Sequence, residues 1–359
     1  AMQNPGADMN PEPTAVAPAA PVAQVNPQIT MLMGEARPLA PAVAALNAEG
    51  LLSLDVTNQP GGTLGKDVPL DPAIQELILT NNRLTELPAE ISCLTSLMCL
   101  GLRQNLVKDM APLSQFTSLT ELDTYENEAK NMEPLQGLTN LTKLDLSFNK
   151  YRKIHCLDAL VGLRELYLVQ NKIVVIENLA TLTNLVTLEL GANRIRVIEN
   201  LGTLTGLENL WLGKNKITQI QNLEALVNLK RISVQSNRLT AIAGLATLTA
   251  LEELYLSHNG ILEMAGLESL TNLNTLDLAG NPITRLACLN LPKLEEFWCN
   301  DSQVADWDSL SLLQNSKNIQ TVYLERTPIA SHPAYAIRLR DLLPSLAQID
   351  AHMLSQTQA

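Results

Sequence analysis

The sequence predicts an α/β solenoid, in which short parallel β-strands stack side by side and each returns to the next through short helical turns. The first observation is a pattern, Leu-x-Leu-x-x-Asn, whose cleanest copy runs from Leu188 to Asn193. Its asparagine recurs with one gap of 23 residues and eight gaps of 22, at Asn82, Asn105, Asn127, Asn149, Asn171, Asn193, Asn215, Asn237, Asn259 and Asn281. The second observation is that 46% of the residues are apolar and only 3% are aromatic, which favours a core of leucine and isoleucine in regular layers.

The repeat length defines the kind of solenoid. Leu188 and Leu210 open successive copies 22 residues apart, a period typical of leucine-rich repeats. In each copy the two leucines of the strand point inward and the residue between them points to the opposite face. The asparagine follows the strand, where its amide can pair with backbone groups that the turn leaves unpaired. With two weaker copies at Ser302 and Thr327, we expect about twelve repeats in a horseshoe with a concave parallel sheet and short helical turns on the convex side.

The two ends of the chain depart from the repeat and are expected to cap it, since an open stack exposes an apolar edge. The first cap contains a helix-compatible stretch at 40–48, and in the second Pro333 is expected to start a helix that Pro344 ends. The predicted boundaries are 1–38 for a Pro/Ala-rich flexible tail, 39–76 for the N-terminal cap, 77–326 for the repeats and 327–359 for the C-terminal cap.

The charge balance restricts the partners. The chain has 25 Lys and Arg residues against 37 Asp and Glu residues, a net charge of -12. This acidity argues against nucleic-acid binding, which needs a basic surface, and favours a partner with a basic face. Five scattered cysteines suit a reducing compartment, and the sequence shows neither a secretory signal nor an apolar run of membrane-spanning length. We therefore expect a cytosolic or nuclear protein that does not bind membranes.

The residue between the two strand leucines is set by neither the core nor the turn. Across the twelve copies it is Ile78, Gly101, Asp123, Asp145, Tyr167, Glu189, Trp211, Ser233, Tyr255, Asp277, Trp298 and Tyr323. Five of these are Tyr or Trp, although the chain has only twelve aromatic residues, four are acidic and none is basic. The residue before the first leucine adds Glu76, Glu121, Glu165, Glu253 and Glu296 against Lys143 and Arg231.

This composition predicts a face that binds a protein partner, because aromatic anchors dominate interfaces and acidic residues among them orient a basic partner. The alternative is that Tyr and Trp are good strand formers and that acidic residues keep the surface soluble. That alternative explains one or two positions but not nine of twelve.

Catalytic and metal constellations are weak. The four histidines are far apart, and Cys156 and Cys288 stand where we align leucine in other copies, which favours core positions over metal ligands. Gly213-Lys214-Asn215 suggests a phosphate loop, but Asn215 belongs to the asparagine series and stands where that loop needs Ser or Thr. We expect no catalytic residue, no cofactor and no metal, and conclude that the chain is not an enzyme.

Several stretches of the 22-residue copies, which are rich in isoleucine, are distinctive. The most specific are Glu296-Phe297-Trp298 and Thr321-Val322-Tyr323-Leu324-Glu325-Arg326, and further ones are Leu100 to Lys108, Leu144 to Asn149, Leu212 to Thr218, Glu253 to Gly260 and Gln348 to Ala351. Together, over residues 70–352, these stretches resemble the protein phosphatase 1 regulatory subunit 7 family. The resemblance implies a non-catalytic subunit that binds the phosphatase 1 catalytic subunit through its concave face and controls its assembly, localisation or activity.

The family's concave contacts, carried over where residue types agree, imply Asp145, Glu189, Asp277, Glu296, Trp298 and Tyr323 as partner-binding residues. Tyr167 and Trp211 stand where the family has phenylalanine, and we include them because they keep the aromatic character. Asp123 and Tyr255 are included because they occupy the same position between the two strand leucines. The resemblance further implies a ternary complex with a phosphatase inhibitor subunit, a location in nucleus and cytoplasm, and a role in mitosis. We expect a monomer on its own. The rival hypothesis is a scaffold for another protein partner, such as a cytoskeletal or RNA-processing assembly, because solenoids have many functions.

Overall fold

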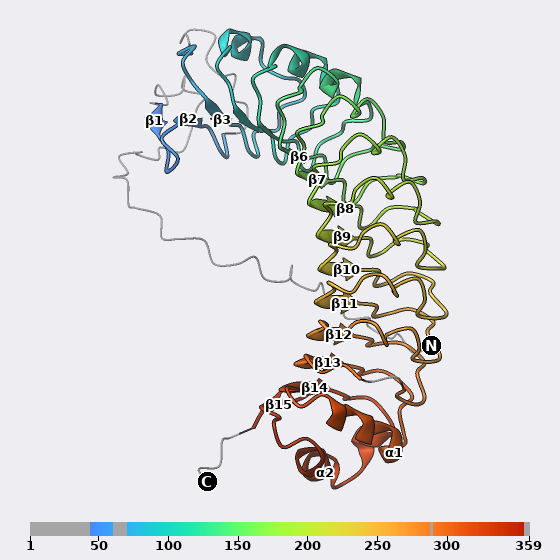
Figure 1. Ribbon diagram of the computed structural model, residues 1–359. Coiled ribbons are helices and arrows are strands. Elements are labelled where there is room, and N and C mark those ends of the chain that lie inside the picture. Colours follow the sequence, from blue (N-terminus) through green and yellow to red (C-terminus); the bar gives the residue numbers. More distant parts are fainter. Residues whose placement is uncertain (1–43, 60–69, 288–289, 355–359) are drawn as a thin grey trace, which may run out of the picture. The chain divides into compact units, whose positions relative to one another are not determined.

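The computed structural model describes residues 44–59, 70–287 and 290–354, so the predicted tail at 1–38 lies outside the described residues. In these ranges sixteen short strands form one continuous sheet, and each strand pairs with its neighbours in sequence (Figure 1). The strands are β1 Ala45–Leu46, β2 Leu52–Asp55, β3 Glu76–Ile78, β4 Cys99–Gly101, β5 Glu121–Asp123, β6 Lys143–Asp145, β7 Glu165–Tyr167, β8 Thr187–Glu189, β9 Asn209–Trp211, β10 Arg231–Ser233, β11 Glu253–Tyr255, β12 Thr275–Asp277, β13 Glu296–Trp298, β14 Thr321–Tyr323, β15 Gln348–Ile349 and β16 His352–Met353. The prediction of a parallel-sheet solenoid is confirmed.

The return segments between the strands contain few helices. Those present in the described residues are the 3₁₀ helices η1 Ala89–Cys93, η2 Ala111–Gln115, η3 Glu133–Leu135, η4 Ser311–Asn315 and η5 Ile329–Ser331, and the α-helices α1 Trp307–Leu310 and α2 Tyr335–Leu342. Helical turns therefore lie near the two ends of the described solenoid, whereas the repeats between β6 and β13 return through tight turns. In Figure 1 the strands follow the inner side of the curved stack and the return segments follow the outer side. In the described part of the chain no helix combines the length and apolar character needed to cross a membrane.

Antiparallel hairpins close both ends of the parallel sheet. β1 pairs with β2 and β15 pairs with β16 in antiparallel register, whereas each pair from β2 to β15 is parallel. The helix predicted at 40–48 is wrong in its described part, because Ala45–Leu46 is a strand and a turn follows it. The side chain of Asn47 holds that turn, since its Oδ1 accepts the backbone N–H groups of Glu49 and Leu51, both at 2.9 Å.

The C-terminal helix differs from its prediction at one end. The helix is expected from the sequence to start at Pro333, but α2 begins two residues later, at Tyr335. The N–H of Tyr335 donates to the carbonyl of His332 at 2.9 Å, in a turn that precedes the helix. The helix ends at Leu342, before Pro344, as predicted. Its buried residues Tyr335 and Leu339 cover the core of the last repeat.

One continuous core fills the stack. The two inward positions of each copy, which are leucine at Leu188 and Leu190, are buried, and the leucines and isoleucines of the return path close the layer from the other side. Tyr151 and Phe297 are the largest fully buried side chains. A regular core of this kind gives each repeat contacts with its direct neighbours only, so the stability of the solenoid is close to a sum over repeats.

The strand-end asparagines form a buried ladder, as the sequence predicts. Asn193 accepts the N–H of Ile173 at 3.0 Å, and its amide donates to the carbonyls of Leu168, Leu190 and Gly191 at 2.8, 3.0 and 3.1 Å. Each asparagine therefore ties its own turn to the preceding repeat. Asn193 is 8% exposed, so these bonds replace water at groups that the turn would leave unpaired.

A second asparagine ladder crosses the return path, and our sequence reasoning missed it. Asn178, Asn200 and Asn222 each donate through Nδ2 to a carbonyl of the preceding repeat at 2.7 Å, and each has a positive φ between 59° and 60°. The signal was present in the sequence, because these residues are also 22 apart. Gly244 takes the same place one repeat further on, with φ 74°.

The position of Gly244 gives a sharp stability prediction. A Cβ added there would lie 2.2 Å from the carbonyl oxygen of Ile220 and would also strain the left-handed backbone. We expect Gly244→Ala to lower the free energy of unfolding by about 2 kcal/mol. The control is Gly202→Ala, because nothing lies within 4 Å of a Cβ at Gly202, and urea unfolding followed by circular dichroism measures both. Equal midpoints for the two variants would contradict this account.

One core prediction is wrong. Cys156 does not occupy a leucine position of the core, because the fully buried residue is Leu157. Cys156 lies instead in the left-handed turn, with φ 56°, at the place that Asn178 occupies in the next repeat, and its side chain is half-buried. Cys288 lies outside the described residues.

Candidate functional site

The strand residues that the repeat leaves free lie in one row along the sheet. Asp145, Tyr167, Glu189 and Trp211 pair in register on the adjacent strands β6 to β9, and the same register continues in both directions. We name the twelve residues the central row: Ile78, Gly101, Asp123, Asp145, Tyr167, Glu189, Trp211, Ser233, Tyr255, Asp277, Trp298 and Tyr323. Nine of the ten predicted site residues lie in this row, and Glu296 lies two residues before Trp298 on the same face.

The predicted residues extend along the sheet rather than converge on one point. From Asp123 on β5 to Tyr323 on β14 there are nine strand intervals, which correspond to roughly 43 Å at the usual spacing. In the described ranges no group of three or more His, Cys, Asp or Glu side chains is arranged to hold a metal ion. The arrangement is suited to contact over a long surface.

The row that contains Glu296 lies beside the central row, and we name it the flanking row. Its members are Glu76, Cys99, Glu121, Lys143, Glu165, Thr187, Asn209, Arg231, Glu253, Thr275, Glu296 and Thr321. Its two cations each pair with the acid on the next strand: Lys143 with Glu165 at 3.9 Å and Arg231 with Glu253 at 2.8 Å. With these cations neutralised, the charge that the flanking row presents is negative.

The flanking glutamates also orient two tyrosines. The hydroxyl of Tyr167 donates to Glu165 at 2.8 Å, and that of Tyr255 donates to Glu253 at 2.8 Å, since residues two apart on a strand share a face. Burial, followed by the hydrogen-bonded glutamate, raises the pKa of both tyrosines well above the ordinary value. Both hydroxyls therefore stay protonated, and their rings are fixed in place along the row.

The aromatic residues form two pairs. The rings of Trp211 and Tyr255 are 6.2 Å apart although they are two strands apart, because Ser233 between them is small and lies beneath, with 3% exposure. Trp298 and Tyr323 are on adjacent strands and meet edge to face at 5.9 Å. Both pairs have the separation that aromatic side chains prefer. The buried Nε1 of Trp298 has no hydrogen-bond partner among the described residues.

The acidic residues of the central row are not equivalent. Asp123, Asp145 and Asp277 each accept, through Oδ1, the backbone N–H two residues further on, at 2.9, 2.9 and 3.0 Å. These aspartates thus stabilise the turn after the strand, and Asp277 is only 5% exposed. Glu189 makes no side-chain hydrogen bond within the described part of the chain. The carboxylate of Glu189 therefore does not stabilise the turn after its strand, in contrast to the three aspartates.

The free carboxylate of Glu189 leads to a pH prediction. Burial, and then the nearby charge of Asp145, raises the pKa of Glu189. Because the pKa of Glu189 is higher in the folded chain than in the unfolded chain, protonated Glu189 favours folding. This contribution to stability is fully present at pH values below the unfolded pKa and is lost as the pH rises through the folded pKa. We therefore expect Glu189→Gln to be more stable than the wild type at pH 7, by up to about 1 kcal/mol, and equal to it below about pH 4.

Urea unfolding at the two pH values measures this difference, and Glu177→Gln on the return path is the control, with the same unfolding midpoint as the wild type expected at both. A Glu189→Gln variant that is less stable at pH 7 would show that the carboxylate has a structural partner.

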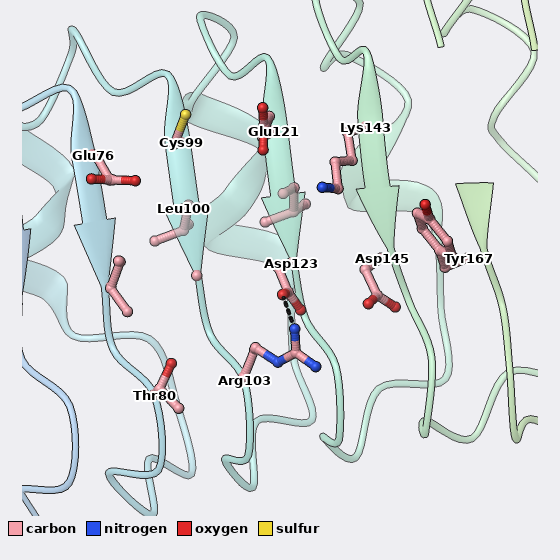
Figure 2. A pocket seen from close by; sticks show the side chains of 13 residues that line it. Glu76, Thr80, Cys99, Leu100, Arg103, Glu121, Asp123, Lys143, Asp145 and Tyr167 are labelled. Carbon is pink, nitrogen blue, oxygen red and sulfur yellow. Dashed lines mark hydrogen bonds and ion pairs between the residues drawn. The ribbon is translucent and has the colours of Figure 1, made fainter. Parts of the chain in front are cut away.

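A hollow lies at the N-terminal end of the central row, and its lining includes Gly101, which has no side chain. Figure 2 shows the side chains around it. It has a volume of about 380 Å³ and is lined by Glu76, Ile78, Thr80, Cys99, Leu100, Gly101, Arg103, Glu121, Leu122, Asp123, Lys143, Asp145 and Tyr167. Arg103 pairs with Asp123 at 3.0 Å and its guanidinium lies 4.4 Å from the ring centre of Tyr125. Burial, and to a lesser extent Asp145, raises the pKa of Asp123.

Sequence reasoning did not identify two side chains that hold the row. Arg103 restrains Asp123, and Gln348 of the C-terminal cap donates to the hydroxyl of Tyr323 at 2.6 Å. Arg103 was detectable, because it lies two residues after Gly101 and so on the same face of the sheet. Gln348 was not, because only the fold places the cap beside β14.

These features define a leucine-rich-repeat solenoid with an acidic and aromatic strand face. Residues 152–256 match the family model described as "Leucine-rich repeat", and residues 271–312 match "Leucine Rich repeats (2 copies)". An internalin from Listeria monocytogenes has a similar structure, with a TM-score of 0.73 and 24% identity over 84% of this chain and 87% of that one. A leucine-rich-repeat protein from Leptospira interrogans is also similar, with a TM-score of 0.66 and 24% identity over 86% and 93%. These structures show the fold alone.

Two curated relatives are named regulatory subunits of a phosphatase. The chain is 41% identical over 66 residues to protein phosphatase 1 regulatory subunit pprA of Dictyostelium discoideum, which is 18% of this chain and 19% of the relative. It is 48% identical over 45 residues to protein phosphatase 1 regulatory subunit 7 of Danio rerio, which is 12% of this chain and 13% of the relative. The matched part thus spans less than a fifth of either relative. The chain thus has the leucine-rich-repeat fold, parts of it match leucine-rich-repeat family models, and short segments are similar to two proteins that are named phosphatase 1 regulatory subunits.

Proposed function

We propose that the chain is a non-catalytic regulatory subunit that binds the protein phosphatase 1 catalytic subunit through the central and flanking rows. The observation that supports this most is the central row itself, which combines two aromatic pairs with the unpaired carboxylate of Glu189. Half-buried aromatic rings with fixed orientation lose little entropy on binding and are the usual anchors of interfaces. The names of the two relatives support the choice of partner.

The electrostatics of the face support a basic surface on the partner. The pKa of Glu189 and that of Glu296 are raised chiefly by burial, so both carboxylates are poorly solvated in the free chain. A cationic group that reaches them gains more than it would from a fully hydrated carboxylate. The predicted contacts of Asp145, Tyr167, Trp211, Trp298 and Tyr323 would surround such charge pairs with aromatic surface.

Titration of the full chain with purified phosphatase 1 catalytic subunit tests the proposal. We expect a complex of defined stoichiometry by calorimetry and by size-exclusion chromatography, with weaker binding at high salt. A serine/threonine phosphatase catalytic subunit of another type is the control. Absence of a complex at micromolar concentrations, or equal binding of both phosphatases, would overturn the proposal. The ternary complex with an inhibitor subunit and the location in nucleus and cytoplasm stay predictions.

A further inference from the structure

The segment after each strand-end asparagine contains a second ordered set of charges, of opposite sign. The residue directly after the asparagine is basic in five consecutive repeats: Lys150, Lys172, Arg194, Lys216 and Arg238. We name these residues the basic stripe. The backbone N–H of each donates to a carbonyl of the preceding repeat, for example Lys172 to Tyr151 and Arg194 to Ile173, both at 2.8 Å. These bonds hold the five residues in register on adjacent repeats.

A neighbouring row strengthens the stripe. The residue between the two rows, such as Ile195, is fully buried, so the residues on either side of it point outward. The two outward rows, from the repeat of Asn105 to that of Asn237, contain nine basic residues and one acidic residue. Their members are Leu106, Glu128, Lys150, Lys172, Arg194, Lys216 and Arg238 in the first row and Lys108, Lys130, Arg152, Val174, Arg196, Thr218 and Thr240 in the second. More than a third of the 25 basic residues of an acidic chain are thus in these two rows.

Most of these cations have no internal counter-charge. Lys150 pairs with Glu128, but within the described ranges Lys172, Arg194, Lys216 and Arg238 form no ion pair. The two cations of the flanking row, in contrast, each form an ion pair with a glutamate on the next strand. A row of like charges without partners is unfavourable in the free chain. The basic stripe therefore has no structural role that these contacts reveal.

We propose that the basic stripe binds an extended acidic polypeptide segment in which Asp or Glu alternates with apolar residues. The charge of the stripe matches an acidic ligand, and exposed valines beside it match the apolar residues. Val174, Val175 and Val197 are 46%, 39% and 41% exposed, on the same repeats as Lys172 and Arg194. This surface is separate from the central row and from the phosphatase that we propose there.

The dimensions of the stripe fit a short peptide. Its five positions are separated by four repeat intervals of roughly 4.8 Å, or about 19 Å, which six residues of extended chain cover at about 3.3 Å each. A nucleic acid fits less well, because the two rows contain no aromatic residue on which bases could stack. A duplex, which is wider than a single peptide, would also lie against acidic neighbours, since Glu189 is only five residues before Arg194 in the same repeat.

Fluorescence anisotropy with the full chain and a labelled twelve-residue peptide, in which glutamate alternates with valine and serine, tests the proposal. The stripe variant combines Lys172→Glu, Arg194→Glu and Lys216→Glu. The control combines Arg164→Glu, Lys317→Glu and Arg340→Glu, which changes the net charge equally at exposed basic residues outside the stripe. We expect the wild type and the control to bind at low salt and the stripe variant to bind at least about tenfold more weakly.

Circular dichroism establishes that each variant is folded, and a second stripe variant, Lys172→Gln with Lys216→Gln, should show a smaller loss in the same direction. Equal losses in the stripe and control variants, or no binding by the wild type, would overturn the proposal. Tighter binding of single-stranded DNA or of anionic lipid vesicles than of the peptide would also overturn it. Because the central row is intact in the stripe variants, their binding to the phosphatase is measured independently.

Discussion

Asn193→Asp is expected to lower the free energy of unfolding by about 4 kcal/mol, because it replaces the side-chain NH₂ donor of this asparagine by an oxygen that can only accept. The substitution keeps the shape and the oxygen that accepts the N–H of Ile173. It replaces the amide donor by an oxygen that faces the carbonyls of Leu168, Leu190 and Gly191. Leu168 and Leu190 are fully buried, so water cannot restore the bonds to their carbonyls.

Urea unfolding followed by circular dichroism measures this loss, and Asn184→Asp is the matched control. Asn184 is exposed, and within the described residues its side chain makes a single hydrogen bond, to the carbonyl of Val161 at 2.9 Å, so we expect a change within about 1 kcal/mol. Because repeats contact only their neighbours, the Asn193 variant should also unfold in two steps rather than one. If Asn193→Asp unfolds at the wild-type midpoint, the ladder does not hold the repeats together.

Trp298→Ala is expected to weaken binding to the phosphatase 1 catalytic subunit by about 3 kcal/mol, or more than about a hundredfold in Kd. Trp298 is half-buried in the central row, and its ring packs edge to face against Tyr323. Truncation removes the larger ring of this pair and leaves Tyr323 without its neighbour. This prediction rests on the proposed function, and surface plasmon resonance with immobilised catalytic subunit measures it.

Trp307→Ala is the control for this loss. Trp307 is also half-buried, but it lies in α1 outside the central row, where the guanidinium of Arg338 covers it at 4.2 Å and His332 meets it edge-on. Its truncation should lower the stability of the C-terminal cap and leave the affinity of the folded chain unchanged. Similar losses of affinity for both tryptophans would mean that the effect comes from destabilisation and not from a contact.

The sequence alone predicts the stack and the register of the central row, because a period of 22 residues and a strand period of two leave little freedom. The two periods therefore predict that Tyr167, Glu189 and Trp211 lie side by side, and the strand register confirms it. The differences arise where the pairing of a strand or the geometry of a turn overrides what the local composition favours. The pairing of Ala45–Leu46 with β2 overrides a helix-compatible composition, and the turn around Cys156 places Leu157 rather than the cysteine in the core.

The side chains of the central row show a second limit of sequence patterns. Asp123, Asp145 and Glu189 are alike in charge and position, but only the two aspartates are short enough to accept the N–H two residues on. The repeat pattern predicts the same role for the four acids of the central row. In the structure the aspartates stabilise the turns, whereas the carboxylate of Glu189 makes no such bond. The partner-binding role of all ten predicted residues stays a prediction.

The antiparallel hairpins at the two ends of the sheet have a consequence for self-association. A parallel stack could accept another chain at either end, because its last strand still has a free line of amide and carbonyl groups. Here β1 and β16 are only two residues long, so each offers too short a template for such growth. Proteolytic removal of β1 at Leu51 would uncover the four-residue strand β2. The truncated chain should then form fibres or head-to-tail oligomers more readily than the intact chain.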